Sequence, residues 1–233
     1  YKDSDPEILK PMKATDLQMD MIPKRTRDGV VMKQGTEVMT GGADTYHGYG
    51  KAWANVSNTP FRQYKHWVHE GGVSTPLIAH WSAGISNDGD SFRSTAEGNL
   101  HDSPSHLIDI MATALDIAGA DYPAENQGNA TKSVEGVSLK PAFDGSSLER
   151  GNPIYFEHEG NRAVRDGQWK LVAKGVNGAW ELYDMEADRT ESTNLIQAKP
   201  ELAEKMIAQY DAWAEHAGVV PFNSWKKDQK RKK

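Results

Sequence analysis

The side chains best suited to chemistry are basic and lie close together in the chain: Arg62, Lys65, His66 and His69. Thr59 suits the N-cap of a helix, and Pro60 suits its first position, where no backbone donor is needed. If residues 60–69 are helical, their spacing puts these basic side chains on one face. A cationic face of this kind, next to a turn and a buried strand, predicts a site for an anion near a sheet edge.

A double glycine and an apolar run follow this basic segment. Gly71 and Gly72 are expected to take positive φ and to end the element. Residues 76–81 are a short apolar run and predict a core strand. The intervening aromatic residues have ordinary core spacing: Phe61, Tyr64 and Trp67. Spacing alone therefore leaves open the alternative that the basic side chains are simply solvated.

The segment 53–81 resembles the part of type I sulfatases that follows their metal-binding Asp-Asn pair. In these formylglycine-dependent arylsulfatases of the alkaline-phosphatase superfamily, a lysine is followed by four residues, Glu-Gly-Gly and an apolar strand ending in Trp. Lys65 and Glu70-Gly71-Gly72 match this pattern. Ser82 and Ala112 stand where the family often has proline, away from the expected chemistry. The resemblance covers residues 26–218 and continues through three further blocks: His106-Leu107-Ile108-Asp109-Ile110, the run 157–167, and Trp180-Glu181-Leu182-Tyr183-Asp184.

The resemblance implies a sulfuric ester hydrolase that cleaves sulfate esters with a formylglycine nucleophile and a calcium ion. Calcium is a hard cation, held in this family by Asp and Asn oxygens. The modification motif Cys/Ser-x-Pro-x-Arg has no match, because Cys is absent and Ser4-Asp5-Pro6-Glu7-Ile8 lacks the arginine. No Asp-Asn pair precedes residue 58. The formylglycine site and the calcium ligands are therefore expected upstream of Tyr1, and this chain alone is expected to be inactive.

Two residues of this chain are expected in the site by the same resemblance. Lys65 is the expected catalytic residue, in contact with a sulfate oxygen and the leaving-group oxygen, since an ammonium is a compact and flexible donor. His69 is the expected substrate-binding residue, with a packing role as an equal alternative. Glu70 is expected to hold the Gly-Gly turn through backbone contacts. No metal ligand is assigned within the chain.

The bulk composition narrows the range of functions. A net charge of −6 gives no reason to expect nucleic-acid binding. The absence of cysteine excludes disulfides, thiolate metal sites and cysteine nucleophiles within these 233 residues. No run of about 18 apolar residues predicts a membrane span, and no signal peptide is visible. The resemblance implies a periplasmic or secreted enzyme acting on a sulfated small molecule or sulfated glycan; it leaves the oligomeric state open.

Residues 1–150 are predicted to be the C-terminal part of a sulfatase catalytic domain with a long N-terminal loop region. Residues 1–50 are polar, interrupted by proline and without periodicity. They are expected to form an insertion or a substrate-facing loop, or to be disordered. A helix is predicted from Ser103-Pro104 to Gly119. Its neighbouring polar residues are expected to cap it, with metal ligation as the less favoured alternative: His101, His106 and Asp109.

Residues 151–225 are predicted to form a small α+β subdomain, and residues 226–233 a basic disordered tail. Alternation predicts four strands: 153–157, 162–165, 169–173 and 179–183. Asp166-Gly167 and Asn177-Gly178 are hairpin signals, and an apolar stripe predicts a helix between Pro200 and Gly218. The fold class is therefore α/β. We expect an incomplete alkaline-phosphatase-like sandwich plus an α+β subdomain with a four-stranded antiparallel sheet and a C-terminal helix.

Three functions remain open from the sequence. The first is the C-terminal part of a sulfatase. The second is a non-catalytic carbohydrate-binding module that uses some of the seven tryptophans. The third is a phosphate-ester hydrolase of the same superfamily. Fold resemblance alone does not choose among them, because function depends on the site that a fold carries.

Overall fold

The computed structural model describes residues 11–20, 22–35, 38–39, 41–46, 48, 50–85, 93–95 and 98–222. The chain divides into two compact units, Tyr1–Thr59 and Pro60–Lys233. The domain boundary predicted at residues 150/151 does not coincide with this division and stays a prediction. The basic tail predicted at residues 226–233 lies outside the described residues.

The described part of the first unit is mostly irregular. It contains two isolated bridges, Arg25 with Val31 and Lys33 with Thr45, and ends in α1, Gly50–Ser57. Within its described residues no helix precedes α1, which agrees with the absence of periodicity in this stretch. The helix α1 itself was not predicted.

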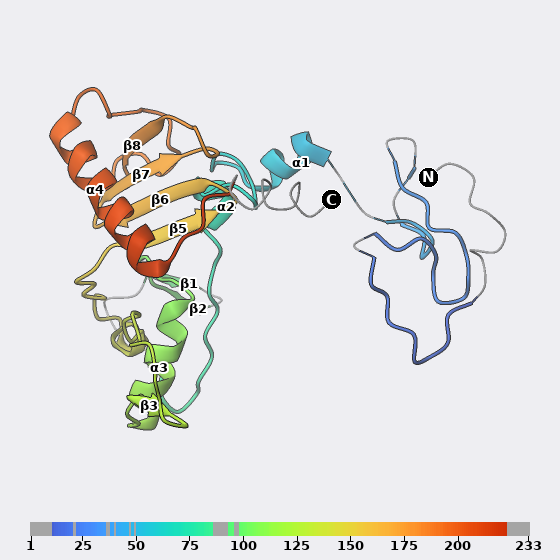
Figure 1. The fold of residues 1–233 in the computed structure, drawn as a ribbon, viewed down its shortest axis with the longest axis horizontal. Coiled ribbons are helices and arrows are strands. Elements are labelled where there is room, and N and C mark those ends of the chain that lie inside the picture. The colour runs from blue at the N-terminus through green and yellow to red at the C-terminus, as the bar shows by residue number, and fades with distance from the viewer. Residues whose placement is uncertain are drawn as a thin grey trace. The chain divides into compact units, whose positions relative to one another are not determined.

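The second unit is built around a four-stranded antiparallel sheet in the order β5-β6-β7-β8 (Figure 1). Its strands follow one another along the chain: β5 Ile154–His158, β6 Asn161–Asp166, β7 Trp169–Ala173 and β8 Trp180–Asp184. The turn after Asp166 brings Asp166 opposite Trp169, with Gly167 at a φ of 55°. The predicted strands and this hairpin are confirmed, because alternating apolar residues and a two-residue turn specify them locally.

Helix α4, Pro200–Ala217, covers one face of this sheet (Figure 1). The register places Val164 opposite Leu171 and Leu171 opposite Leu182, so one apolar row crosses strands β6, β7 and β8. That row packs against the buried stripe of α4: Ala203, Met206 and Tyr210. Gly218 closes the helix in a left-handed conformation at φ 70°, as its position after the last apolar residue predicts.

The opposite face of the sheet packs against the segment that contains the basic cluster. Val68 is buried with Ala163, Val172 and Tyr183, and Val73 packs against the same group. The segment between Phe61 and Val73 is therefore the second cover of the sheet. This packing positions the candidate site.

That segment ends in the short helix α2, Glu70–Val73, and the remaining described elements lie between it and the sheet in sequence. They are the antiparallel pairs β1 Arg93–Thr95 with β2 Gly98–Leu100 and β3 Glu125–Asn126 with β4 Asn129–Ala130, the helix α3 Ile108–Ala118, and the 3-10 helix η2 Lys140–Asp144. Gly119 ends α3 as predicted, but the helix begins four residues after Pro104. Its predicted apolar face is largely exposed, and the side chains that it buries are Asp109 and Thr113.

Two predicted elements are absent from the described residues. Residues 60–69 form turns and bends instead of a helix, with Gln63 at φ 67° and His66 at φ 101°, values that no right-handed helix allows. Residues 76–81 are extended but unpaired, and Ile78 is 89% exposed. A strand is stabilised by hydrogen bonds to a neighbouring strand, and no described strand pairs with residues 76–81.

No described helix is both long and apolar enough to span a bilayer.

Candidate active site

Arg62 fastens the loop that carries Lys65, residues 61–69, to the last strand of the sheet. Its guanidinium donates to the hydroxyl of Tyr183 at 2.7 Å and to the main-chain oxygen of Glu191 at 2.6 Å. It also lies 3.3 Å from the carboxylate of Glu181 on β8. Burial raises the pKa of Tyr183, and the Glu181 acceptor raises it further, so the phenol stays protonated at neutral pH. Arg62 is thus committed to internal partners and does not belong to a cationic face.

Gly71 and Gly72 let the chain fold back tightly on this loop. The amide of Gly71 donates to the carbonyl of Arg62 at 2.9 Å. A Cβ atom at Gly71 would overlap the carbonyls of Arg62 and Gln63, and one at Gly72 would overlap the carbonyl of Trp67. The prediction that these glycines take positive φ is wrong, because both lie in α2 with negative φ. Close backbone approach is what requires glycine here.

Gly72→Ala is expected to lower the free energy of unfolding by about 1–3 kcal/mol, because the new methyl group forces the Trp67 carbonyl out of place. Urea unfolding followed by tryptophan fluorescence measures the change. Gly151→Ala is the matched control, since a Cβ there meets nothing within 4 Å. Equal losses in the two variants would show that close approach at Gly72 is not what glycine provides.

A buried group of three charged side chains holds α2 against the sheet: Glu70, Lys170 and Glu191. The Lys170 ammonium lies 2.9 Å from the Glu70 carboxylate and 2.8 Å from the Glu191 carboxylate. Lys170 is 1% exposed and Glu191 is fully buried. Burial alone would raise the pKa of Glu70, but the Lys170 ammonium outweighs it and holds that pKa below its usual range. The three side chains therefore form a compensated ionic cluster.

This ionic cluster fixes the start of α2 through both main chain and side chain. The amide of Glu70 donates to Glu191 Oε2 at 3.0 Å. Arg189 adds a further contact, 3.4 Å from Glu70 Oε2. Glu70 thus holds the Gly-Gly turn as expected, but its side chain does so through Lys170 and Arg189 rather than through backbone donors.

His69 lies beneath the loop and not in an open pocket. Its side chain is 1% exposed, and its Nε2 is 3.5 Å from Glu181 Oε2. Burial lowers the pKa of His69 below the ordinary imidazole value, although Glu191 and Glu181 act in the opposite direction. A neutral, buried imidazole fits the packing alternative that spacing left open. Substrate binding by His69 stays a prediction.

Lys65 is exposed and lines an open groove of about 560 Å³. The groove lies between the loop, α2 and strand β5, which is one of the two edge strands of the sheet. Lys65 is the only Lys or Arg among the described residues that line it. Aromatic and imidazole side chains form much of its wall: His66, Trp67, Tyr155, Phe156 and His158. One lysine thus faces a groove that a ligand can enter.

The polar residues near α3 are structural. Asp109 is fully buried, and its carboxylate accepts from the amides of His106 at 2.7 Å and Val137 at 3.0 Å and from the Arg150 guanidinium. His106 packs edge-on against Phe156, with ring centroids 5.4 Å apart. His101 contacts the main-chain oxygen of Ser146 at 2.9 Å. The side chains of these three candidates therefore contact different groups, and among the described residues they do not converge on one metal position.

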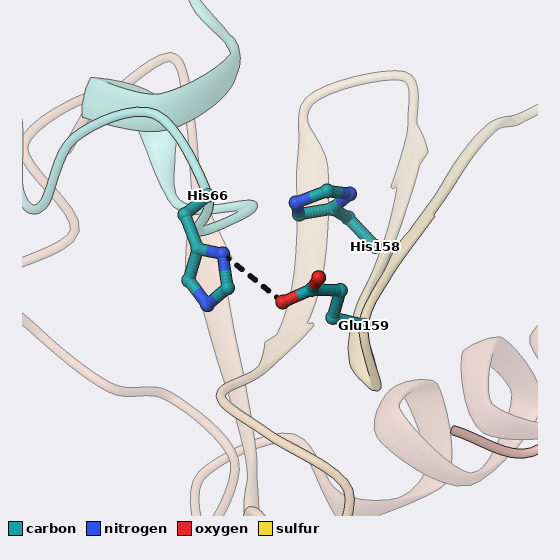
Figure 2. A group of neighbouring side chains, drawn as sticks. All are labelled: His66, His158 and Glu159. Atoms are coloured by element: carbon teal, nitrogen blue, oxygen red, sulfur yellow. Dashed lines mark ion pairs between the residues drawn. The ribbon is translucent and has the colours of Figure 1, made fainter. Parts of the chain in front are cut away.

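The structure brings together one set of metal-ligating side chains that the sequence analysis missed. His66, His158 and Glu159 place one ligand atom each within 4.8 Å of one another (Figure 2). They come from the loop, from the end of β5 and from the β5–β6 turn, with His66 92 and 93 residues before the other two in sequence. No local spacing signals such a site. Among the described residues it is the only group of three or more His, Asp or Glu side chains with this geometry.

An uncharacterized sulfatase from Schizosaccharomyces pombe is 27% identical over 191 residues, covering 77% of this chain and 32% of that protein. A sulfatase from Formosa agariphila is 28% identical over 188 residues, covering 72% and 32%. The crystal structure of Ps i-CgsB matches with a TM-score of 0.52 at 23% identity, over 67% of this chain and 32% of that one, and supports the fold alone.

The chain spans about a third of the length of these curated relatives. The family model described as N-sulphoglucosamine sulphohydrolase, C-terminal, matches residues 61–212. This match begins with the loop 61–69 and contains the ionic cluster, the groove residues other than Trp213, the whole sheet and most of α4. The chain belongs to the N-sulphoglucosamine sulphohydrolase C-terminal family of sulfatases.

Proposed function

We propose that this chain is the C-terminal part of a sulfuric ester hydrolase and that Lys65 is its contribution to catalysis. The observation that carries the proposal is the position of Lys65. It is an exposed ammonium on a groove, separated by four residues from the Glu70-Gly71-Gly72 turn, on a loop that Arg62 and the ionic cluster hold in place. The family match over residues 61–212 supports the same assignment.

The role proposed for Lys65 is to stabilise charge on the transferred sulfuryl group and on the leaving oxygen. A fixed cation that meets charge as it develops lowers the barrier to reaction. Rigidity matters, because a donor that is already in place needs no reorganisation during the reaction. The contacts of Arg62 and Glu70 supply that rigidity on either side of Lys65. Lys65 is thus proposed to bind and orient the sulfate group.

The described residues do not fit the calcium ion that the family implies. Calcium prefers six to eight oxygen ligands, and the only candidate group, His66, His158 and Glu159, offers two imidazoles. The chain also contains no Cys/Ser-x-Pro-x-Arg motif for formylglycine. We propose that the nucleophile and the calcium ligands are supplied by residues outside this chain, and that the chain alone is inactive.

The proposed substrate is a sulfated small molecule or a sulfated glycan. A periplasmic or secreted location, which the family resemblance implies, also stays a prediction.

The carbohydrate-module alternative has less support. Around the sheet, four tryptophans each have one ring face against an internal partner: Trp67 against Lys174, Trp169 against Lys199, Trp180 against Arg162, and Trp213 against Tyr155. Stacking on a sugar would require these faces to be open.

The test separates sulfate from phosphate chemistry in the complete enzyme. We expect kcat/KM for an aryl sulfate to exceed that for the matching aryl phosphate by about 100-fold, or ~2.7 kcal/mol. A phosphate monoester carries more negative charge than a sulfate monoester. Lys65 is the only Lys or Arg among the described residues that line the groove, and Glu157 adds a negative charge there. A preference for the phosphate ester would replace the proposal with its phosphatase alternative.

A further inference from the structure

Two histidines and a glutamate converge at the rim of the groove that Lys65 lines. Figure 2 shows the His66 ring facing the Glu159 carboxylate, with the His158 ring beside them. His66 Nδ1 is 3.4 Å from Glu159 Oε2, and the centroids of the two imidazoles are 5.2 Å apart. The side chains of His66 and Glu159 are 42% and 47% exposed. The three groups are therefore close together and within reach of an ion from solution.

A buried amide fixes the backbone beneath both histidines. Asn161 is 1% exposed, and its Nδ2 donates to the carbonyl of His66 at 3.1 Å and to the carbonyl of His158 at 2.8 Å. Its Oδ1 accepts from the amide of Gly175 at 2.8 Å. One side chain thus ties the loop to the end of β5. The main-chain positions of the two histidines are therefore held together by the buried Asn161 side chain.

The backbone at two of the three residues is in an unfavourable conformation. His66 has φ 101°, and Glu159 has φ 52°. Glu159 and Gly160, at φ 83°, form the two-residue turn between β5 and β6, where Asn, Asp or Gly usually precedes glycine. Conformations of this kind cost of order 1–3 kcal/mol each and concentrate at functional sites. Here they direct both side chains to one point.

We propose that His66, His158 and Glu159 form a binding site for a borderline transition-metal ion such as Zn²⁺. Imidazole nitrogens and a carboxylate oxygen are ligands that zinc prefers, at about 2.0–2.2 Å. Tetrahedral geometry at that bond length separates neighbouring ligand atoms by about 3.3–3.5 Å, close to the 3.4 Å between His66 and Glu159. Three protein ligands leave a fourth position for water or an anion. The site does not depend on sulfatase activity.

The test is titration of the tag-free chain with ZnCl₂ by isothermal calorimetry, with Co²⁺ absorption as a second readout of coordination. We expect one zinc ion per chain. His158→Ala and Glu159→Gln are each expected to weaken binding by at least about tenfold, since even indirect supports of metal ligands contribute about 10–100-fold to affinity. Circular dichroism verifies that each variant keeps its fold.

His216→Ala is the matched control. His216 Nε2 lies 3.3 Å from Glu135 Oε1, an exposed pair of similar geometry with no second histidine in its described surroundings. This variant is expected to bind zinc like the wild type. The site is refuted if the wild type binds no zinc, or if His158→Ala and Glu159→Gln, both folded, retain wild-type affinity. An equal loss in His216→Ala refutes it as well, because binding would then be general to surface histidines.

Discussion

Lys65→Ala, made in a complete enzyme that contains this chain, is expected to lower kcat/KM for a sulfate ester by about 100-fold or more, while the unfolding midpoint stays close to that of the wild type. Removal of one preorganised donor from the reacting oxygens typically reduces rate by about 10²–10³. Stability should be spared because Lys65 is exposed and lies on the groove. Steady-state kinetics and urea unfolding of the same preparations separate the two effects.

Two further variants test whether the loss of turnover in Lys65→Ala comes from the position of the missing ammonium or only from the loss of one positive charge. Lys174→Ala removes a nearby lysine whose ammonium lies over the Trp67 ring, 4.3 Å from its centroid, and which does not line the groove. It is expected to change turnover only slightly. Lys65→Arg keeps the charge but replaces a compact ammonium with a planar fork, so only partial activity should return. Wild-type turnover in Lys65→Ala would remove Lys65 from the mechanism.

The sheet and α4 could be predicted from sequence because local signals specify them. Alternation in 169–173, the Asp166-Gly167 turn and the apolar stripe before Gly218 each act within a few residues. The β5–β6 turn was not predicted, since Glu159 is an unusual residue at positive φ. The helix predicted at residues 60–69 failed for a tertiary reason. Arg62 is drawn to Tyr183 and Glu191, more than 120 residues away, and Gly71 bonds back to Arg62.

The site was predictable only at the residues that match the family's Lys and Glu-Gly-Gly pattern. Lys65 and the Gly-Gly turn followed from the family pattern. The ionic cluster did not, because its members lie 21–121 residues apart. One local signal was present: Lys170 stands between Trp169 and Leu171 in a strand that is otherwise apolar. A charged residue inside such a strand requires a buried partner, but the sequence does not say which carboxylate provides it.

Lys170→Ala is expected to lower the free energy of unfolding by about 3–5 kcal/mol, the second large effect that the structure predicts. The loss follows from burial more than from the ion pairs themselves. With Lys170 removed, the carboxylates of Glu70 and Glu191 remain inside the protein without the cation that lies 2.9 Å and 2.8 Å from them. Urea unfolding monitored by fluorescence measures the change. Since Glu70 begins α2, the same substitution should also make the adjoining loop 61–69, which carries Lys65, less rigid.

Two controls distinguish uncompensated charge from lost packing. Lys140→Ala breaks an exposed pair with Asp116, 3.0 Å apart, and is expected to leave the urea midpoint nearly unchanged, as surface pairs contribute little. The triple variant Glu70→Gln, Lys170→Met, Glu191→Gln removes all three charges while keeping similar volumes. It is expected to recover more than half of the stability that Lys170→Ala loses, because no buried charge is left unpaired. If the triple variant is as unstable as Lys170→Ala, the loss arises from packing around the Lys170 stem, and the carboxylates are not what that lysine compensates.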